Sequence, residues 1–154
     1  MHTVSARQQI VQERGVTLGL LLHLIRTNAA SLPNGKLISA KAEPLEVHHI
    51  FPRAYLNKSS SETKTFQADR LGNLTITYRA DNEFMSDAPP AESLAESPED
   101  TLRHHFIPLD RNLWSLGNYE KFCEERERLL ANGIGDLLRS LGIKDAEPPQ
   151  TPEG

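Results

Sequence analysis

The chain has 154 residues, of which 38% are apolar and 25% are charged, and its formal net charge is −4. These values predict a single soluble globular domain. One cysteine, Cys123, excludes internal disulfides and paired-cysteine zinc sites and fits a reducing, cytoplasmic location. The longest apolar run, Val16 to Ile25, is too short to span a bilayer, so we expect no membrane association. The acidic balance argues against a dedicated, high-affinity nucleic-acid binder, but not against a catalytic module that another domain delivers.

The first predicted element is a helix from about Ala6 to Thr27. Its apolar residues recur at helical spacing and form a stripe of Leu18, Leu21, Leu22 and Ile25. Further leucines lie outside the stripe, so the helix is either well buried or packs on a neighbouring domain. Residues 1–36, which end in the turn Pro33-Asn34-Gly35, are expected to pack on, or continue from, an upstream domain.

Residues 37–142 are predicted to form an α+β, mostly helical domain, built on a two-stranded antiparallel hairpin and a short helix. The first strand runs from Leu45 to Phe51 and stops at Pro52, and the second runs from Leu74 to Tyr78. A long, structureless connection, about Arg53 to Gly72, is typical of a functional loop. The short helix follows the second strand, from Arg79 to Ser86.

The last third of the chain is predicted to be helical and to surround the hairpin. Short helices begin near Pro90 and Ser97, a longer one covers Asn118 to Leu130, and a last one covers Ile134 to Leu141. The charges from Glu124 to Arg128 indicate a solvated helix face. Residues 143–154 are predicted to be a disordered tail.

Adjacent histidines on the first strand are the most informative feature of the sequence. Because side chains alternate along a strand, His48 and His49 point to opposite faces, so one can ligate a metal while the other has another task. Asn82 on the short helix adds a carboxamide. The two histidines and this carboxamide together suggest a one-metal hydrolytic site. Phosphodiester hydrolysis needs a base, which a neutral histidine supplies, and positive charge on the phosphoryl and leaving oxygens, which one cation supplies.

The same residues resemble the HNH, or ββα-metal, nuclease motif. The stretch from Glu46 to Leu56 is most similar to the C-terminal HNH module of GmrSD-type restriction endonucleases. Further matches are Leu71 to Thr75, Asp81-Asn82, Ser86 to Pro90, His105 to Pro108, Leu113-Trp114 and Phe122 to Leu130, so that the resemblance runs from about Leu45 to Leu138. In that family an NTPase-like domain that senses modified DNA precedes the nuclease; this chain lacks it and is therefore expected to be a fragment or a stand-alone relative.

The resemblance implies a role for each residue. His49 matches the general base, His48 and Asn82 match the metal ligands, and Asn73 matches the asparagine that ties down the long loop and so supports catalysis. Each has a simpler reading: the histidine pair as packing or a solvated turn, Asn73 as turn chemistry, and Asn82 as a polar helix face. Their joint spacing favours the nuclease site. The implied cofactor is Mg²⁺ or Mn²⁺, and a histidine ligand also permits Ni²⁺ or Zn²⁺.

Met85 departs from the family pattern, because relatives commonly carry a lysine there that can meet substrate phosphate. A thioether cannot neutralise an anion, so Arg53, Arg79 or Lys58 would have to substitute for that lysine. Two functions stay open: a metal-dependent DNA endonuclease module of a restriction or phage-defence protein, and a catalytically silent HNH-fold domain that binds DNA or a partner protein.

Three other residues or pairs are assigned no chemistry. The pair His104-His105 lacks a carboxamide or carboxylate at matching spacing and is read as packing or capping. Trp114 is predicted to anchor the core, and Cys123 is predicted to be inert.

Overall fold

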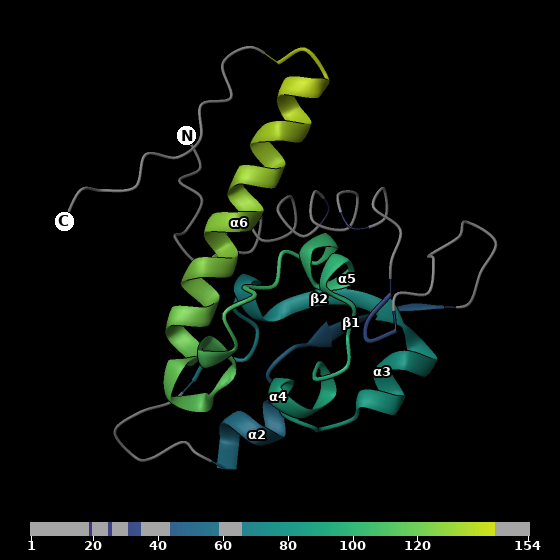
Figure 1. Cartoon of the computed structure of the whole chain (residues 1–154), viewed down its shortest axis with the longest axis vertical. Coiled ribbons are helices and arrows are strands. Elements are labelled where there is room, and N and C mark those ends of the chain that lie inside the picture. The colour runs from purple at the N-terminus through teal and green to yellow at the C-terminus, as the bar shows by residue number, and fades with distance from the viewer. Residues whose placement is uncertain (1–18, 20–24, 26–30, 35–43, 59–65, 144–154) are drawn as a thin grey trace, which may run out of the picture.

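A computed structural model of the chain describes residues 19, 25, 31–34, 44–58 and 66–143 (Figure 1). Its centre is an antiparallel pair of strands, β1 (Leu45–His49) and β2 (Leu74–Tyr78), in a register that runs from Leu45 opposite Tyr78 to His49 opposite Leu74. The helices are α2 (Arg53–Lys58), α3 (Arg79–Met85), α4 (Pro90–Ser93), α5 (Glu99–His104) and α6 (Tyr119–Ser140), with the 3₁₀ turns η1 (Leu71–Asn73), η2 (Arg111–Trp114) and η3 (Leu116–Asn118). None of the described helices is long and apolar enough to cross a membrane.

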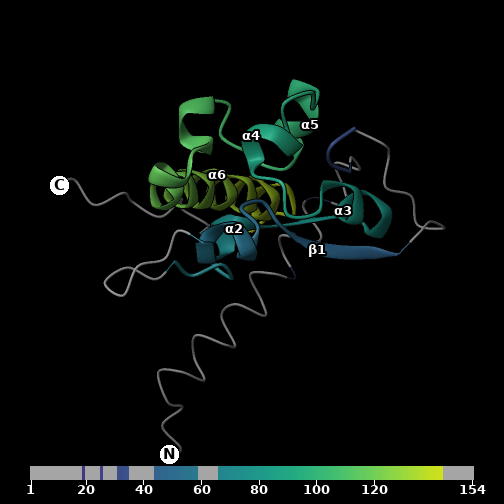
Figure 2. The same cartoon turned by 90° about the horizontal axis from the view of Figure 1, so that it is seen from below.

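The hairpin followed directly by α3 confirms the predicted α+β, mostly helical fold. The Leu-Thr-Ile-Thr-Tyr alternation fixed the bounds of β2 correctly. β1 ends at His49, two residues earlier than predicted, because the backbone N–H groups of Ile50 and Phe51 both turn to Asn73, one to its carbonyl and one to its side chain. Figures 1 and 2 show α3 at one side of the hairpin and α6 at the other.

Two predictions about the loops and helices are wrong. The connection from Arg53 to Gly72 contains a helix, α2, and a 3₁₀ turn, η1, so its described parts are not structureless. The last two predicted helices form one helix of 22 residues, α6. Asn132 and Gly133 lower helix propensity by about 1 kcal/mol each at most, which does not end a helix that contains no proline and has buried residues on both sides of this pair, at Leu130 and Gly135.

The main core lies between α6 and the chain that follows β1. Phe51 packs edge-to-face on Tyr119 and Phe122, with ring centroids 5.1 and 5.0 Å apart, and each such pair adds about 0.5–1.5 kcal/mol beyond its burial. Trp114 is buried in the same cluster and donates from Nε1 to the carbonyl oxygen of Pro108, as predicted for a core anchor. Because Phe51 follows His49 by two residues, this core holds the end of β1 in place.

Charged side chains of α6 hold the turn that leads into β2. Arg126 is fully buried and donates from Nη1 to the carbonyl oxygens of Leu71, Gly72 and Leu74 at 3.2, 3.1 and 2.6 Å. Glu127 accepts two hydrogen bonds from Arg70 and one from the backbone N–H of Gly72. The prediction of a solvated face is therefore wrong for these two residues, which bind the backbone of η1 and, through Arg126, that of Leu74 at the start of β2.

The predicted helix at Ala6 to Thr27 lies outside the described residues except for Gly19 and Ile25, and the predicted tail lies outside them except for Ile143. The boundaries 1–36, 37–142 and 143–154 therefore stay a prediction. The turn at Pro33 is present, and the preceding Ser31 and Leu32 are buried against β2, where Thr77 bonds to both.

Candidate active site

His48 and Asn82 meet where β1 passes α3. Register and alternation place His48 opposite Thr75 on one face of the hairpin, and α3 follows β2 without a loop, so it packs against the same strands. Nδ1 of His48 lies 2.7 Å from Oδ1 of Asn82. The amide nitrogen of Asn82 donates to Oε2 of Glu46 at 2.9 Å, which orients the amide so that its oxygen faces the imidazole.

The electrostatics around His48 favour a neutral ring. Burial lowers the pKa of His48 below its ordinary 6.5, the hydrogen bond that its ring donates to Asn82 partly opposes this shift, and the charges of His49 and Arg126 add to it. A neutral imidazole nitrogen and an amide oxygen are both cation ligands. The other ring nitrogen of His48, Nε2, is buried without a hydrogen-bond partner in the described part of the chain.

These donors fit a divalent cation. Nδ1 of His48 and the amide oxygen of Asn82 lie 2.7 Å apart, and a cation held by both would replace the proton that Nδ1 donates to that oxygen; a carboxylate, Glu46, is adjacent. The described residues contain no group of three or more His, Cys, Asp or Glu side chains that could hold a metal, so the pair would form an open site completed by water or substrate rather than a closed structural one. His48 and Asn82 are the residues that would hold the ion.

The ring of His49 is hydrogen-bonded to Asp69, a residue of the long connection between β1 and β2. Nε2 of His49 lies 2.8 Å from Oδ1 of Asp69, and the same oxygen accepts a hydrogen bond of 2.8 Å from Nη2 of Arg53. The hydrogen bond from His49, and then the bond and charge of Arg53, hold the pKa of Asp69 below its usual value against the effect of its partial burial. Asp69 is thus ionised at neutral pH and can only accept hydrogen bonds.

Asn73 joins the chain after β1 to the connection. Its buried side chain accepts from the N–H of Phe51 at 2.7 Å and donates to the carbonyl oxygens of Phe51 and Ala68 at 3.0 and 2.8 Å. Both donor hydrogens of the amide and one of the two acceptor positions of its oxygen are thus used within the protein. These bonds tie the residues after β1 to Ala68, which directly precedes Asp69 in the connection.

A cleft of about 260 Å³ lies at this end of the hairpin. Its lining comes from β1, the start of α2 and the end of α3: Val47, His48, His49, Pro52, Arg53, Asn82, Ser86 and Asp87. Ser86 ends α3 with a φ of 47°, which turns the chain toward the cleft. The two histidines therefore line one cleft although they leave the strand on different faces.

The three candidate phosphate-binding cations differ in position. Arg53 lines the cleft, whereas Lys58 and Arg79 are not among its lining residues, and Arg79 pairs with Glu46 and Glu83. Met85 is buried in the main core, so in this chain that position points into the protein and not toward substrate.

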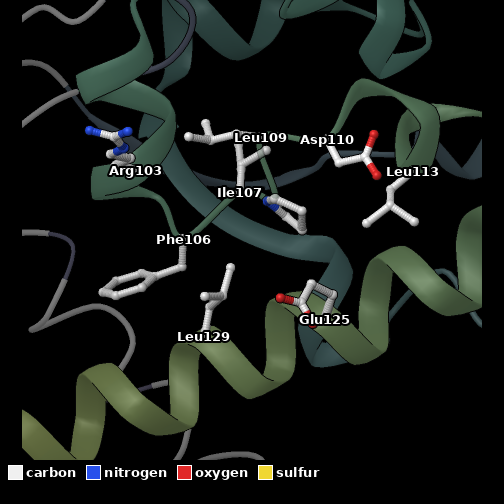
Figure 3. A pocket seen from close by; sticks show the side chains of 9 residues that line it. Arg103, Phe106, Ile107, Leu109, Asp110, Leu113, Glu125 and Leu129 are labelled. Atoms are coloured by element: carbon white, nitrogen blue, oxygen red, sulfur yellow. The ribbon is translucent and has the colours of Figure 1, made fainter.

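A second hollow, of about 480 Å³, lies away from these residues. Figure 3 shows Leu129 and Glu125 rising from α6 toward the segment that contains Phe106 and Ile107. Its lining is mostly apolar and includes neither histidine of the pair nor Asn82. The candidate chemistry therefore belongs to the smaller cleft.

The remaining sequence predictions can be placed. His105 is buried at the C-terminus of α5, where its Nδ1 lies 2.6 Å from the hydroxyl of Thr75, as expected for packing or capping. Cys123 is buried, and burial raises its pKa to about 11 despite the hydrogen bond with Tyr119. Sequence reasoning missed Asp69 and assigned no role to Glu46. Glu46 lies within the histidine motif, but no spacing rule marks Asp69.

A comparison with known protein families matches residues 8–132 to GmrSD restriction endonucleases, C-terminal domain. No curated protein and no solved structure matches the chain.

Proposed function

This chain belongs to the family of GmrSD restriction endonuclease C-terminal domains, and from that premise we propose that it is a metal-dependent HNH-type DNA endonuclease module of a restriction or phage-defence protein. The observation that carries the proposal is the meeting of His48 and Asn82 at 2.7 Å in a cleft that His49 also lines. In support of the proposal, the side chains proposed as cation ligands and as base line one cleft of about 260 Å³.

Each residue has a distinct part in the proposed reaction. His49 accepts a proton from the attacking water, since an imidazole is an effective base near neutral pH. His48 and Asn82 hold a divalent cation, which supplies positive charge to the phosphoryl oxygens and to the departing oxyanion. Arg53 contacts a substrate phosphate from the rim of the cleft, and Asn73 keeps the surrounding loop in place.

The setting of the module is also part of the proposal. Mg²⁺ or Mn²⁺ is the expected ion, with Ni²⁺ or Zn²⁺ compatible with the imidazole ligand. The expected location is the cytoplasm, and the expected partner is an upstream NTPase-like sensor domain that brings the module to DNA. Between positions 41 and 90 the chain has six Lys or Arg against seven Asp or Glu. Unaided DNA binding should therefore be weak, non-selective and steeply salt-dependent.

One observation favours the second candidate function, a catalytically silent domain that binds DNA or a partner protein. Met85 is buried in the core, so the cation that relatives commonly carry at that position has no equivalent there. The intact set of His48, His49 and Asn82 favours the endonuclease.

Plasmid cleavage separates the two functions. The purified chain is incubated with supercoiled plasmid and Mg²⁺ or Mn²⁺, with and without chelator, beside the His49→Ala variant. An endonuclease gives nicked or linear plasmid that disappears with chelator and falls by a factor of about 10²–10⁴ in the variant. If wild-type protein leaves the plasmid intact at high concentration with every metal, the chain is the silent domain.

A further inference from the structure

Asp69 is the only described residue that bonds the ring of His49. The contact joins Oδ1 of Asp69 to Nε2 of His49 at 2.8 Å across 20 residues of sequence. Both side chains are accessible, at 60% and 28% of their full exposure, so neither is held there by burial in the core. The hydrogen bonds of Asn73 to Phe51 and Ala68 hold the two backbone segments that carry the pair.

This contact determines where the proton of a neutral His49 ring resides. An ionised carboxylate has no proton to donate, so Nε2 of His49 must be the protonated nitrogen. In a neutral imidazole the other nitrogen, Nδ1, then carries the lone pair. A base must offer a lone pair to the attacking water. Only the Nε2–H tautomer has this lone pair on Nδ1, so only that tautomer can accept a proton at Nδ1.

We propose that Asp69 is a positioning residue that fixes the Nε2–H tautomer and the ring orientation of His49, so that Nδ1 is the basic atom in the cleft. The inference deepens the proposed function, since it names the atom of His49 that would accept the proton. Asp69 touches neither water nor substrate in this scheme and acts through the imidazole alone.

Arg53 offers a competing explanation for any effect of Asp69. Oδ1 of Asp69 also accepts from Arg53, which lines the cleft, so the loss of Asp69 would free a cation as well as the ring. A freed cation changes substrate affinity, whereas a misdirected base changes the rate of the chemical step. An effect through Arg53 should therefore appear in KM, and an effect through the His49 ring should appear in kcat.

The direct test is the tautomer of His49 in the metal-free chain, which does not depend on cleavage. Nitrogen-15 NMR of the imidazoles, with His49 assigned from His49→Gln among the six histidines, reports which nitrogen is protonated. We expect the Nε2–H form in wild type and in Asp69→Glu, and a mixture of both tautomers in Asp69→Ala. Asp87→Ala removes a carboxylate that lines the cleft of His49 but is not bonded to its ring, and it should keep the wild-type signal.

Cleavage kinetics complete the test. Asp69→Ala should lower kcat by roughly 10–100-fold with little change in KM, and Asp69→Glu should restore part of the loss. If Asp69→Ala destabilises the fold, Asp69→Leu, which keeps the side-chain size but has no acceptor, replaces it in both measurements. A His49 signal that is the same in wild type and in every Asp69 variant overturns the inference, as does an effect of Asp69→Ala on KM alone. If wild type shows the Nε2–H tautomer but never cleaves DNA, the proposed function fails and the positioning by Asp69 stands.

Discussion

His48 and Asn82 are 34 residues apart in the sequence, yet a ring nitrogen and an amide oxygen of the two meet at 2.7 Å. Two local features bring them together. The register puts His48 opposite Thr75, and α3 begins directly after β2 ends at Tyr78, so its first turn carries Asn82 back over the same face. The contact between His48 and Asn82 is therefore a consequence of hairpin register and of the absence of a loop before α3.

The proposed roles predict that His48→Ala and Asn82→Ala weaken metal binding by at least about tenfold, because each removes one of the two proposed protein ligands. His49→Ala should leave metal affinity close to wild type, since His49 bonds Asp69 on the other side of the strand. Calorimetric titration of the three variants with Mn²⁺ gives the comparison, and excess Mn²⁺ should partly restore cleavage in the first two. Loss of metal binding in His49→Ala, with retention in His48→Ala, would exchange the two roles.

Arg53 is predicted to make the phosphate contact that Met85 cannot make. Arg53→Gln should weaken DNA binding and reduce the slope of log affinity against log salt by about 1, the value for one lost phosphate contact. Lys58→Gln is the matched control, because Lys58 ends the same helix, α2, but does not line the cleft. Equal effects of the two substitutions on the salt slope would show that the contact is not specific to the cleft.

The sequence predicted the hairpin, α3 and the histidine–asparagine pair because periodicity and motif spacing are local signals. The partners of those residues were not predictable in the same way. Asp69 reaches His49 from a connection whose path depends on three hydrogen bonds of Asn73. Arg126 resembles a solvated charge in sequence because its partners are backbone carbonyl groups, which every residue has. A buried charge whose partners are backbone groups therefore cannot be recognised from the spacing of residue types in the sequence.

Cys123 should be unreactive in the folded protein. Burial raises the pKa of its thiol to about 11, so almost none is thiolate at pH 8, and the side chain is inaccessible as well. A thiol reagent such as DTNB should react slowly with native protein at pH 8 and rapidly in denaturant. Above pH 9 the unfolded chain loses the proton of the Cys123 thiol, whereas the folded protein keeps it until about pH 11. The free energy of unfolding is therefore expected to fall as the pH rises from 9 toward 11. Rapid labelling of native protein at pH 8 would contradict the buried placement.

Gly72 is predicted to tolerate no side chain. A Cβ atom at this position would lie 2.5 Å from the carbonyl oxygen of Cys123 and 2.7 Å from its Cα, so η1 and α6 would have to separate. Gly72→Ala should lower the free energy of unfolding by about 1–3 kcal/mol and displace Asn73. Gly117 also lies in a 3₁₀ turn but has open space around it, so Gly117→Ala should be neutral or slightly stabilising. Urea unfolding of both variants tests the close approach, and equal stabilities would refute it.

Arg126 is predicted to be the main polar support beneath the site. Its guanidinium donates to carbonyl oxygens of Leu71, Gly72, Leu74 and His105, which joins η1, the start of β2 and the end of α5 to α6. Burial lowers the pKa of Arg126 to about 9, which still leaves it charged at neutral pH.

Arg126→Met keeps most of the side-chain volume but removes every donor, so several buried carbonyl groups lose their partner. We expect the free energy of unfolding to fall by about 3 kcal/mol, because each unsatisfied buried acceptor costs about 1–3 kcal/mol and the structure relaxes in part. Arg128→Met is the matched control two residues along the same helix, where the side chain is exposed and pairs with Glu125, and stability should hardly change. Urea unfolding measures both variants, and a stable Arg126→Met protein would show that the charge of Arg126 is dispensable for holding η1 on α6.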